Sequence, residues 1–474
     1  MTGHGDAAGR TRTRRPHLLP AGRGPCMGPG VRAPLLLQAL VLEGVTLIDG
    51  TGAPPRPDVT LLIQDGRIAA IGARGQVPFP ELAPVVDLAG RTVIPGLIDA
   101  HAHVTFLRRV AGAEREYDEA TTRRVLRLLL AFGVTGARNP MAPAAAGVAL
   151  RDAVASGALP GPRLRTAGDA IDLGGFPTVG AVRQEVARQA ALGVDDVKVY
   201  AGLPPSLVQA AITSAHDHGL GIVGHLQATS WSEAARAGID FLSHGAPWSE
   251  GLLAPEHRGA YRRAIRREGA LKARLRWLEW LDPHGPEVRA TARELAQRRV
   301  PVDPTLIAWE TKVRGDDPAY TASPDLLLLP EAILDSWRRG TFTEDWTPAD
   351  FARGRGLWPK FLELVRVYDE QGVTLLAGSD LPNPWVVPGA GLHRELELLV
   401  SAGLPPLRVI AIATGNAARA FGWDDLGTLE VGKRADIVVL AGDPTQDIRH
   451  TRRIEAVYLA GRRLSPAPAR GLRN

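Results

Sequence analysis

The sequence predicts an α/β protein: a (β/α)8 TIM barrel with a small composite β-sandwich built from both chain ends. Between residues 93 and 422, short apolar strands alternate with helical patterns, which is typical of parallel β/α architecture. Eight candidate strands occur there, the number that closes such a barrel. Residues 39–92 and 423–466 instead carry short alternating strands separated by turn signals. We therefore expect these two segments to form one β-domain together.

The two extreme ends lie outside this fold. Residues 1–38 are rich in Gly, Pro and Arg without hydrophobic periodicity, which predicts a disordered basic arm, and residues 467–474 are expected to be a tail. The arginines of the first 40 residues, against Asp6 alone, account for the whole formal net charge of +5. The rest of the chain is neutral, so its charge does not indicate a nucleic-acid partner. Met27 is an alternative start.

Composition excludes several classes of protein. In 474 residues with 45% hydrophobic side chains, no apolar run is long enough to span a membrane. Cys26 is the only cysteine, which excludes an intramolecular disulfide framework and indicates a reducing, cytoplasmic location. Any metal must therefore be held by nitrogen and oxygen ligands. The expected partner is a small-molecule substrate, with no nucleic acid and no membrane, and a homo-oligomer is left open.

Short strands are expected in both parts of the β-domain. The expected ranges are 41–48, 59–63, 67–71, 85–87, 91–93, 435–440, 454–459 and 462–464. In the first part, Asp49-Gly50, Asp65-Gly66 and Ala89-Gly90 separate neighbouring strands, and such pairs are typical of hairpin turns. Ala460-Gly461 is a turn of the same kind near the other end of the chain.

Strands and helices alternate through the barrel segment. The expected strands are 93–99, 133–138, 163–166, 194–200, 221–225, 241–244, 300–303 and 374–380. The expected helices include 117–132, 182–192, 204–218, 230–237 and 349–371. Residues 248–299 form an insertion between the sixth and seventh strands, on the face where such barrels carry their catalytic groups.

The insertion is rich in arginine and tryptophan. It contains Trp248, Trp277, Trp280, Arg258, Arg262, Arg263, Arg266, Arg267, Arg274 and Arg276. One interpretation is a helical lid whose arginines attract an anionic or carboxylate-bearing substrate. The alternative is a solvated helical arm or a contact between subunits.

Residues 94–103, Ile-Pro-Gly-Leu-Ile-Asp-Ala-His-Ala-His, end the first barrel strand with two histidines. Side chains alternate along a strand, so His101 and His103 point to the same side while Ala102 points away. Two imidazoles at that spacing can bind one divalent ion without a bend in the backbone. The His-x-His pattern also occurs by chance, so further ligands are needed to support a metal site.

Further candidate ligands lie at the ends of other strands. His225, His244 and Asp380 end the fifth, sixth and eighth expected strands. Catalytic groups in such barrels lie at the carboxyl ends of strands. Taken alone, each histidine could be an ordinary core residue, and Asp380 a helix cap or turn residue. Together with His101 and His103, they predict one metal centre.

Lys198 lies within the fourth expected strand, in a chain with 51 arginines and only five lysines. On an interior strand, desolvation disfavours the charged amine, so Lys198 could be neutral and nucleophilic. A neutral lysine can take up carbon dioxide as a carbamate, an anionic ligand that bridges two metals. The alternative is a lysine whose amine reaches solvent at the barrel end.

Other side chains are weaker candidates. Tyr200 faces the same side as Lys198 and could donate to a substrate carbonyl or carboxylate, or it could be a core or rim tyrosine. Arg138 and Asn139, at the end of the second strand, could line the mouth of the site. His393 could support the site from behind or act as a structural cap, and the structural role is favoured.

These residues occur in motifs that resemble the metal-dependent amidohydrolase superfamily, within it the imidazolonepropionase-like and prolidase-like (Xaa-Pro or Xaa-Arg dipeptidase-like) group. The resemblance covers residues 41–464. Its motifs are residues 93–103, Val197-Lys198-Val199-Tyr200, His225, Ser243-His244-Gly245, Gly378-Ser379-Asp380, residues 413–418 and residues 427–440. They are specific for the superfamily and much less so for the substrate.

The resemblance implies roles for the candidate ligands. His101 and His103 look like ligands of a buried metal, and His225 and His244 like ligands of a second one. Lys198 looks like the carbamylated bridge between the two divalent ions, for which zinc is the default with nitrogen and oxygen ligands. Asp380 looks like the ligand that also moves protons. Relatives of the imidazolonepropionase type use one metal and lack the bridging lysine, so Lys198 favours the binuclear branch.

The implied activity is hydrolysis of a C–N amide bond of a small substrate, a dipeptide or an N-acyl amino acid. A metal-bridged hydroxide would attack the carbonyl, and Asp380 would pass its proton to the leaving nitrogen. Two alternatives stay open. One is a hydrolase of cyclic amides with one metal, as in imidazolonepropionase, and the other is a non-catalytic binding protein on the same fold.

Overall fold

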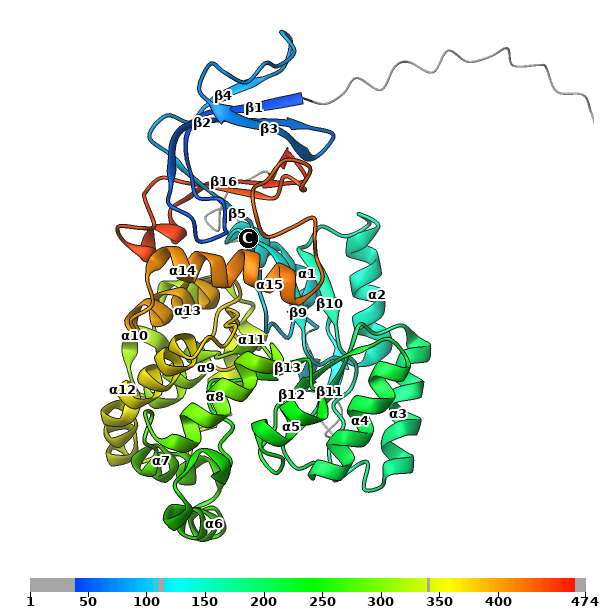
Figure 1. The fold of residues 1–474 in the computed structure, drawn as a ribbon, viewed down its shortest axis with the longest axis vertical. Coiled ribbons are helices and arrows are strands. Elements are labelled where there is room, and N and C mark those ends of the chain that lie inside the picture. Colours follow the sequence, from blue (N-terminus) through cyan, green and yellow to red (C-terminus); the bar gives the residue numbers. More distant parts are fainter. Residues whose placement is uncertain (1–38, 106, 110–114, 339–341, 465–474) are drawn as a thin grey trace, which may run out of the picture. The chain divides into compact units, whose positions relative to one another are not determined.

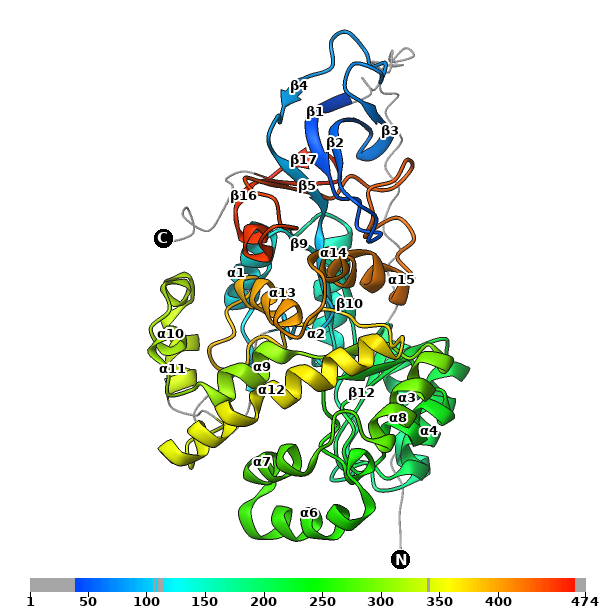
Figure 2. The same ribbon diagram turned by 60° about the vertical axis from the view of Figure 1, so that its left-hand side comes forward.

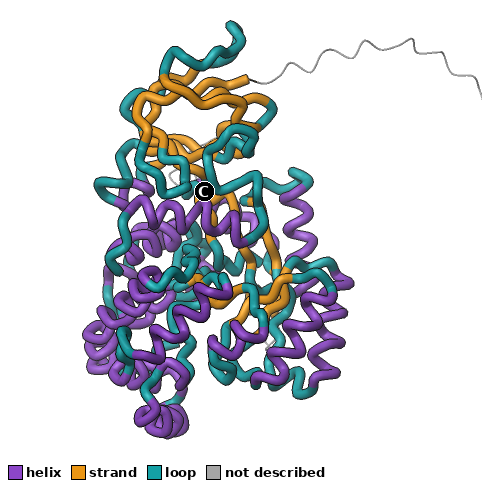
Figure 3. The backbone as a smooth tube through the Cα atoms, viewed as in Figure 1, coloured by secondary structure: helices purple, strands orange, loops and turns teal. Residues whose placement is uncertain are grey.

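The structure, a computed structural model, describes residues 39–105, 107–109, 115–338 and 342–464. Over these residues the fold is mixed α/β, with strands and helices interleaved along the chain (Figures 1 and 3). The predicted basic arm 1–38, with Cys26 and Met27, and the predicted tail lie outside the described residues. No helix in the described part is both long and apolar enough to cross a membrane.

Both ends of the chain contribute to one eight-stranded sheet, which confirms that the two segments belong together (Figure 1). Its strands are β1 (Ala39–Leu47), β2 (Arg56–Gln64), β3 (Arg67–Ala73), β4 (Val85–Asp87), β5 (Thr92–Pro95), β15 (Ile437–Leu440), β16 (Ile454–Leu459) and β17 (Arg462–Arg463). The order is β17-β16-β15-β5-β1-β2-β3, with β4 also paired to β1. Side chains from both ends, among them Leu61 and Val439, share one apolar cluster.

Two of the residue pairs that were expected to form hairpin turns do so in this sheet. Asp65-Gly66 joins β2 to β3 and Ala460-Gly461 joins β16 to β17, and all four residues have the positive φ that tight hairpins require. The hairpin expected at Ala89-Gly90 is wrong. β4 and β5 both pair with β1 in parallel, opposite residues 41–43 and 46–47, so they follow one another along the same strand and do not pair with each other.

Gly96 is the point at which the chain passes from the terminal sheet into the parallel part of the fold. The predicted strand 93–99 is two strands in the structure, β5 in the terminal sheet and β6 (Leu97–Asp99) in a parallel sheet. A Cβ on Gly96 would overlap the side chain of Thr135, with Cγ2 only 2.6 Å away. Glycine is therefore needed where the two backbones approach.

Two parallel sheets carry the strands that the sequence predicts for the barrel. The first has the order β10 (Arg163–Thr166), β9 (Val134–Asn139), β6, and the second has the order β11 (Asp196–Val199), β12 (Gly221–Gly224), β13 (Phe241–Ser243), β14 (Val302–Asp303). The predicted strand 374–380 is not a regular strand. It forms only isolated parallel bridges, Val302 with Leu375 and Ala102 with Leu381, and its Asp380 has a left-handed φ of 56° that regular β structure does not allow.

The five predicted helices are present. They are α1 (Glu119–Ala131), α3 (Val179–Leu192), α4 (Pro205–Asp217), α5 (Trp231–Ala237) and α12 (Pro348–Glu370). Local capping explains several starts. The Asp118 side chain accepts the Thr121 N–H at the start of α1, and Ser230 with Glu233 forms a capping box at α5. Further helices are α2 (Ala144–Ala155), α13 (Ala390–Ser401), α14 (Pro406–Ala411) and α15 (Ala417–Ala420).

Two helical excursions interrupt the alternation. The predicted insertion 248–299 holds α6 (Pro255–Glu268), α7 (Ala270–Trp280) and α8 (Pro286–Arg298), and Figure 2 shows α6 and α7 beside each other. A second excursion after β14, with α9 (Leu306–Val313), α10 (Pro318–Thr321) and α11 (Glu331–Arg338), was not predicted. Its helices are short, so their hydrophobic periodicity gives a weak signal.

Replacing Gly96 by alanine should destabilise the protein by about 1–3 kcal/mol, because the new methyl group overpacks against Thr135. Chemical unfolding with urea measures the change. Gly356→Ala is the matched control, since Gly356 lies exposed within α12 and an added Cβ meets nothing within 4 Å. An unfolding free energy of Gly96→Ala that equals the wild-type value would contradict the close approach at this position.

Candidate metal centre

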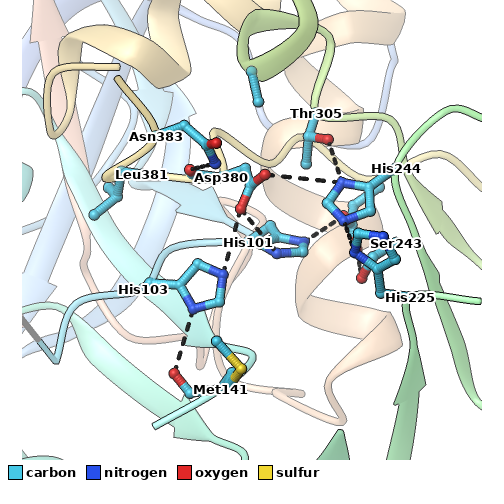
Figure 4. Close-up of polar contacts among 12 residues, drawn as sticks. His101, His103, Met141, His225, Ser243, His244, Thr305, Asp380, Leu381 and Asn383 are labelled. Carbon is cyan, nitrogen blue, oxygen red and sulfur yellow. Dashed lines mark hydrogen bonds and ion pairs between the residues drawn. The ribbon is translucent and has the colours of Figure 1, made fainter. Parts of the chain in front are cut away.

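Four histidines and one aspartate face a common point in the parallel part of the fold (Figure 4). His101 and His103 follow β6, His225 follows β12 and His244 follows β13. Asp380 lies in the segment that bridges to Ala102 through Leu381. Parallel neighbouring strands present their carboxyl ends at the same edge, which is why residues far apart in sequence meet here.

His101, His244 and Asp380 form a buried group whose ligand atoms all lie within 4.8 Å of one another, and this group can hold a metal ion. His101 Nε2 is 3.3 Å and His103 Nε2 is 3.4 Å from Oδ1 of Asp380. Two atoms bound to one tetrahedral zinc ion by bonds of ~2.1 Å lie about 3.4 Å apart. The spacing of these pairs therefore fits a shared ion.

Hydrogen bonds hold three of the imidazoles with Nε2 turned to the centre. His101 Nδ1 lies 2.7 Å from Oδ1 of Asp303, and His103 Nδ1 lies 3.3 Å from the carbonyl oxygen of Met141. His244 Nδ1 lies 2.8 Å from the Thr305 hydroxyl. Metal-binding histidines usually donate their second nitrogen to such a partner, which fixes the ring and the tautomer.

His225 is bonded to its neighbour His244. Its Nδ1 lies 2.7 Å from His244 Nε2, and its ring lies 4.5 Å from the ring of Tyr200, centroid to centroid. One of the two facing nitrogens must carry the proton of this hydrogen bond. An ion that bound both nitrogens would need both lone pairs, so its binding requires that proton to leave.

The protonation states suit metal binding. Burial holds the pKa of His101, His225 and His244 well below the usual range, and the charge of Lys198 acts in the same direction. These imidazoles are therefore neutral, the form that binds metals. Burial acts to raise the pKa of Asp380, but its contacts with His101 and His103 and the charge of Lys312 together outweigh burial, so the pKa is lowered and the carboxylate stays ionised.

Two ligand positions have strained backbone. His244 has a φ of 73° and Asp380 a φ of 56°, and Thr305, which bonds to His244, has a φ of 47°. Residues other than glycine rarely adopt this left-handed backbone conformation. Residues that do adopt it are found most often at functional sites, where the surrounding structure holds them in place. The strain here coincides with the metal-binding group.

Lys198 lies inside the fold beside this group, with 1% of its surface exposed. Burial lowers its pKa to about 8, although the carboxylates of Asp303 and Asp380 act to raise it. Among the described residues, the amine forms neither a hydrogen bond nor an ion pair. A buried amine without a partner that is partly neutral near pH 8 has the properties expected of a reactive lysine.

Asp303 is the functional residue that the sequence analysis missed. It is fully buried at the end of β14 and accepts hydrogen bonds from His101 Nδ1 and from Arg138 Nη2, the latter at 2.6 Å. Burial raises its pKa to about 6, against the effect of Arg138 and Lys198. An acidic residue that ends the seventh expected strand was a signal that could have found it.

Arg138 does not line the mouth of the site, which corrects that expectation. It is fully buried, with Nε donating to the Ala100 carbonyl at 2.8 Å and the guanidinium 4.6 Å from the centroid of the Phe241 ring. The sequence placed Arg138 at the correct end of β9, but its side chain points into the interior of the fold. Its role is to hold Asp303.

Asn139 and His393 are the two remaining weak candidates. Asn139 is fully buried and donates to the Thr105 hydroxyl at 2.7 Å, while its Oδ1 has no hydrogen-bond partner among the described residues. His393 is fully buried on α13, and both ring nitrogens are bonded, Nδ1 to Thr451 at 2.9 Å and Nε2 to the Phe132 carbonyl at 3.0 Å. His393 therefore has no nitrogen free for a substrate.

Comparisons with known proteins identify similar sequences and similar structures. The profile of the Amidohydrolase family matches residues 359–464. Imidazolonepropionase from Cereibacter sphaeroides is 25% identical over 422 residues, which cover 84% of this chain and 91% of the relative. A putative prolidase from Bifidobacterium longum has a similar structure, with a TM-score of 0.65 and 24% identity over 91% of this chain and 96% of that chain.

A Xaa-Pro dipeptidase with methionine bound in its active site is similar in structure to the same degree, with a TM-score of 0.65 and 20% identity over 90% of this chain and 99% of that chain. At such identities the two structures show a shared fold. The chain is therefore similar to amidohydrolases along most of its length, and its buried His-His-Asp group can hold a metal ion.

Proposed function

We propose that the protein hydrolyses a C–N amide bond of a small substrate, a dipeptide or an N-acyl amino acid, with the help of divalent metal ions. The observation that carries the proposal is the buried group of His101, His244 and Asp380, beside which lie two more imidazoles and a lysine amine without a partner. A core without a metal would have no need for so many desolvated polar groups.

The fold proposed for this function is a closed (β/α)8 barrel of residues 93–422, with residues 39–92 and 423–466 forming the β-domain. Single parallel bridges support the closure. They connect Ala167 to Asp196 between the two parallel sheets, Val302 to Leu375 at the far edge, and Leu381 to Ala102 beside β6. These bridges lie where a closed barrel would need contacts between neighbouring strands.

Six side chains would hold the ions. His101 and His103 would hold one ion and His225 and His244 the other, with Asp380 and a carbamylated Lys198 as further ligands. Imidazoles, a carboxylate and a carbamylated lysine are the donor set expected of such a site, and zinc is the ion that this set favours. When bound, the ions supply Lewis acidity, which activates a water molecule and polarises an amide carbonyl.

The protein's own residues would orient the substrate and move the proton. Asp380 is positioned for proton transfer, because its N–H donates to the His101 carbonyl at 2.7 Å and its own carbonyl accepts from Asn383 Nδ2 at 2.7 Å. Its ionised carboxylate would accept a proton from water and pass it to the leaving nitrogen. Tyr200, beside His225, would donate its hydroxyl to the substrate.

A second candidate is hydrolysis of a cyclic amide with one metal ion. The observation that favours it is the similarity to imidazolonepropionase along 84% of the chain. The number of ions per chain distinguishes the two candidates, because only the two-metal site has a use for a bridging Lys198. Metal analysis of the purified protein therefore separates them before any substrate is known.

Replacing Lys198 by alanine should abolish turnover and halve the metal content, because the bridge between the ions is lost. Elemental analysis and a screen of dipeptides, N-acyl amino acids and lactams, after reconstitution with zinc and bicarbonate, measure both effects. Lys433→Ala is the control, since Lys433 pairs with Glu430 in the loop before β15. An active Lys198→Ala variant with unchanged metal content would remove the carbamate from the mechanism.

Activation of the metal-free protein by zinc, at a fixed concentration of dissolved carbon dioxide, should be faster at higher pH. Only the neutral amine of Lys198 reacts with carbon dioxide, and burial lowers its pKa to about 8. The neutral fraction rises about tenfold per pH unit below that value and levels off above it. Activation is carried out at several pH values between 6 and 9. Samples are withdrawn at intervals and assayed at one common pH, which gives the activation rate at each value. A rate that does not change over this range would contradict a carbamylation step.

A further inference from the structure

Two cations from the helical excursions meet at one indole ring. The guanidinium carbon of Arg274, on α7, and the ammonium nitrogen of Lys312, on α9, each lie 4.9 Å from the centroid of the Trp309 ring. The two charges therefore lie at most twice that distance apart. Like charges repel at this range when they are partly removed from water, so their proximity calls for an explanation.

Neither cation has an acidic partner. Among the described residues, no carboxylate lies within 4.0 Å of Arg274 or of Lys312, whereas the neighbouring Arg276 pairs with Glu279 at 3.3 Å. The Nε of Arg274 is buried, and in the described part of the chain it has no hydrogen-bond acceptor. Lys312 donates only to neutral groups, the Ala308 carbonyl at 2.7 Å and Asn383 Oδ1 at 3.2 Å.

Both cations lie on the side of the metal centre. Lys312 is connected to it through Asn383, which also donates to the backbone carbonyl of Asp380 at 2.7 Å. The charges of Arg274 and Lys312 both act to lower the pKa of His225, so both lie near its ring. Burial lowers the pKa of Lys312 to about 8, although the carboxylate of Asp380 acts to raise it, and burial lowers the pKa of Arg274 to about 10.

We propose that Arg274 and Lys312 bind a carboxylate of the substrate, with Trp309 as the surface between them. The planar guanidinium binds a carboxylate through two parallel hydrogen bonds, and the ammonium adds a further charged donor. The substrate class is then an amide that carries a free carboxylate close to the cleaved bond, as in a dipeptide or an N-acyl amino acid. This assignment rests on the proposed function of the metal centre and specifies its substrate.

The surroundings of Arg274 suggest one competing explanation, a structural role. The guanidinium carbon also lies 5.4 Å from the centroid of the Trp248 ring. In this explanation, Arg274 only stabilises the fold by stacking against two indole rings. A structural role predicts lower stability on substitution without any change in the preference for an acid over an amide. A carboxylate site predicts loss of that preference, and a lysine in place of Arg274 should retain part of it.

Binding of matched ligand pairs to the zinc-loaded full chain tests the proposal. The probes are N-acetyl amino acids with Ala, Leu, Met, Phe and Pro side chains and their C-terminal carboxamides. Calorimetry and tryptophan fluorescence measure the binding of each probe. The wild type should bind at least one acid about ten- to a hundredfold more tightly than its amide. Arg274→Met and Lys312→Met should each remove most of that ratio, while Arg276→Met, which removes an acid-paired charge from the same helix, should leave it unchanged.

Equal binding of acids and amides by the wild type would overturn the assignment, as would an undiminished ratio in both variants. Lys312 is only half-buried, so Lys312→Met keeps the test decisive if Arg274→Met does not fold. Because binding is measured without turnover, failure of the two proposals can be told apart. Hydrolysis without an acid preference would refute the carboxylate site alone, and an acid preference without hydrolysis would refute the enzyme alone.

Discussion

The candidate metal centre depends on one buried set of charges, in which Asp303 lies between His101 and Arg138. Asp303 ends β14, Arg138 belongs to β9, and Arg138 also donates to the carbonyl of Ala100 just after β6. Desolvation of a carboxylate is costly unless strong donors surround it, and here an imidazole and a guanidinium provide them. The same contacts join the two parallel sheets and fix the ring of His101, so the fold and the site are held by one interaction.

The eight-stranded sheet is connected to the candidate site by the segment that runs from β5 through Gly96 to His101. β5 pairs with β1 and with β15, and Gly96 then leads directly into β6 and His101. The close approach of Gly96 to Thr135 on β9 sets the path between the two sheets. A strand anchored at one end in this way has little freedom at the other, which suits a residue that must hold an imidazole in a fixed orientation.

The sequence predicted that His101, His244 and Asp380 would come together, because parallel strands impose a simple rule. His225, His244 and Asp380 end candidate strands, and strand ends of this kind meet at one edge. The same rule does not say which way a side chain points. Arg138 was therefore predicted to line the mouth of the site, although its side chain is buried against Asp303. Asp303 also ended a candidate strand, but a single aspartate there is equally typical of a turn. Lys312 was missed because α9 is too short for a clear periodic pattern.

The pairing of β5 with β15 has a consequence for how the protein is made. The contact joins residues 92–95 to residues 437–440, so it spans most of the chain. During synthesis, the segment that leads to His101 cannot pair with this strand until residues 437–440 have also left the ribosome. Long-range pairings of this kind form late and slowly. The edge of β5 therefore stays open in the nascent chain, and chaperones that cover exposed strands would have the most time to act there.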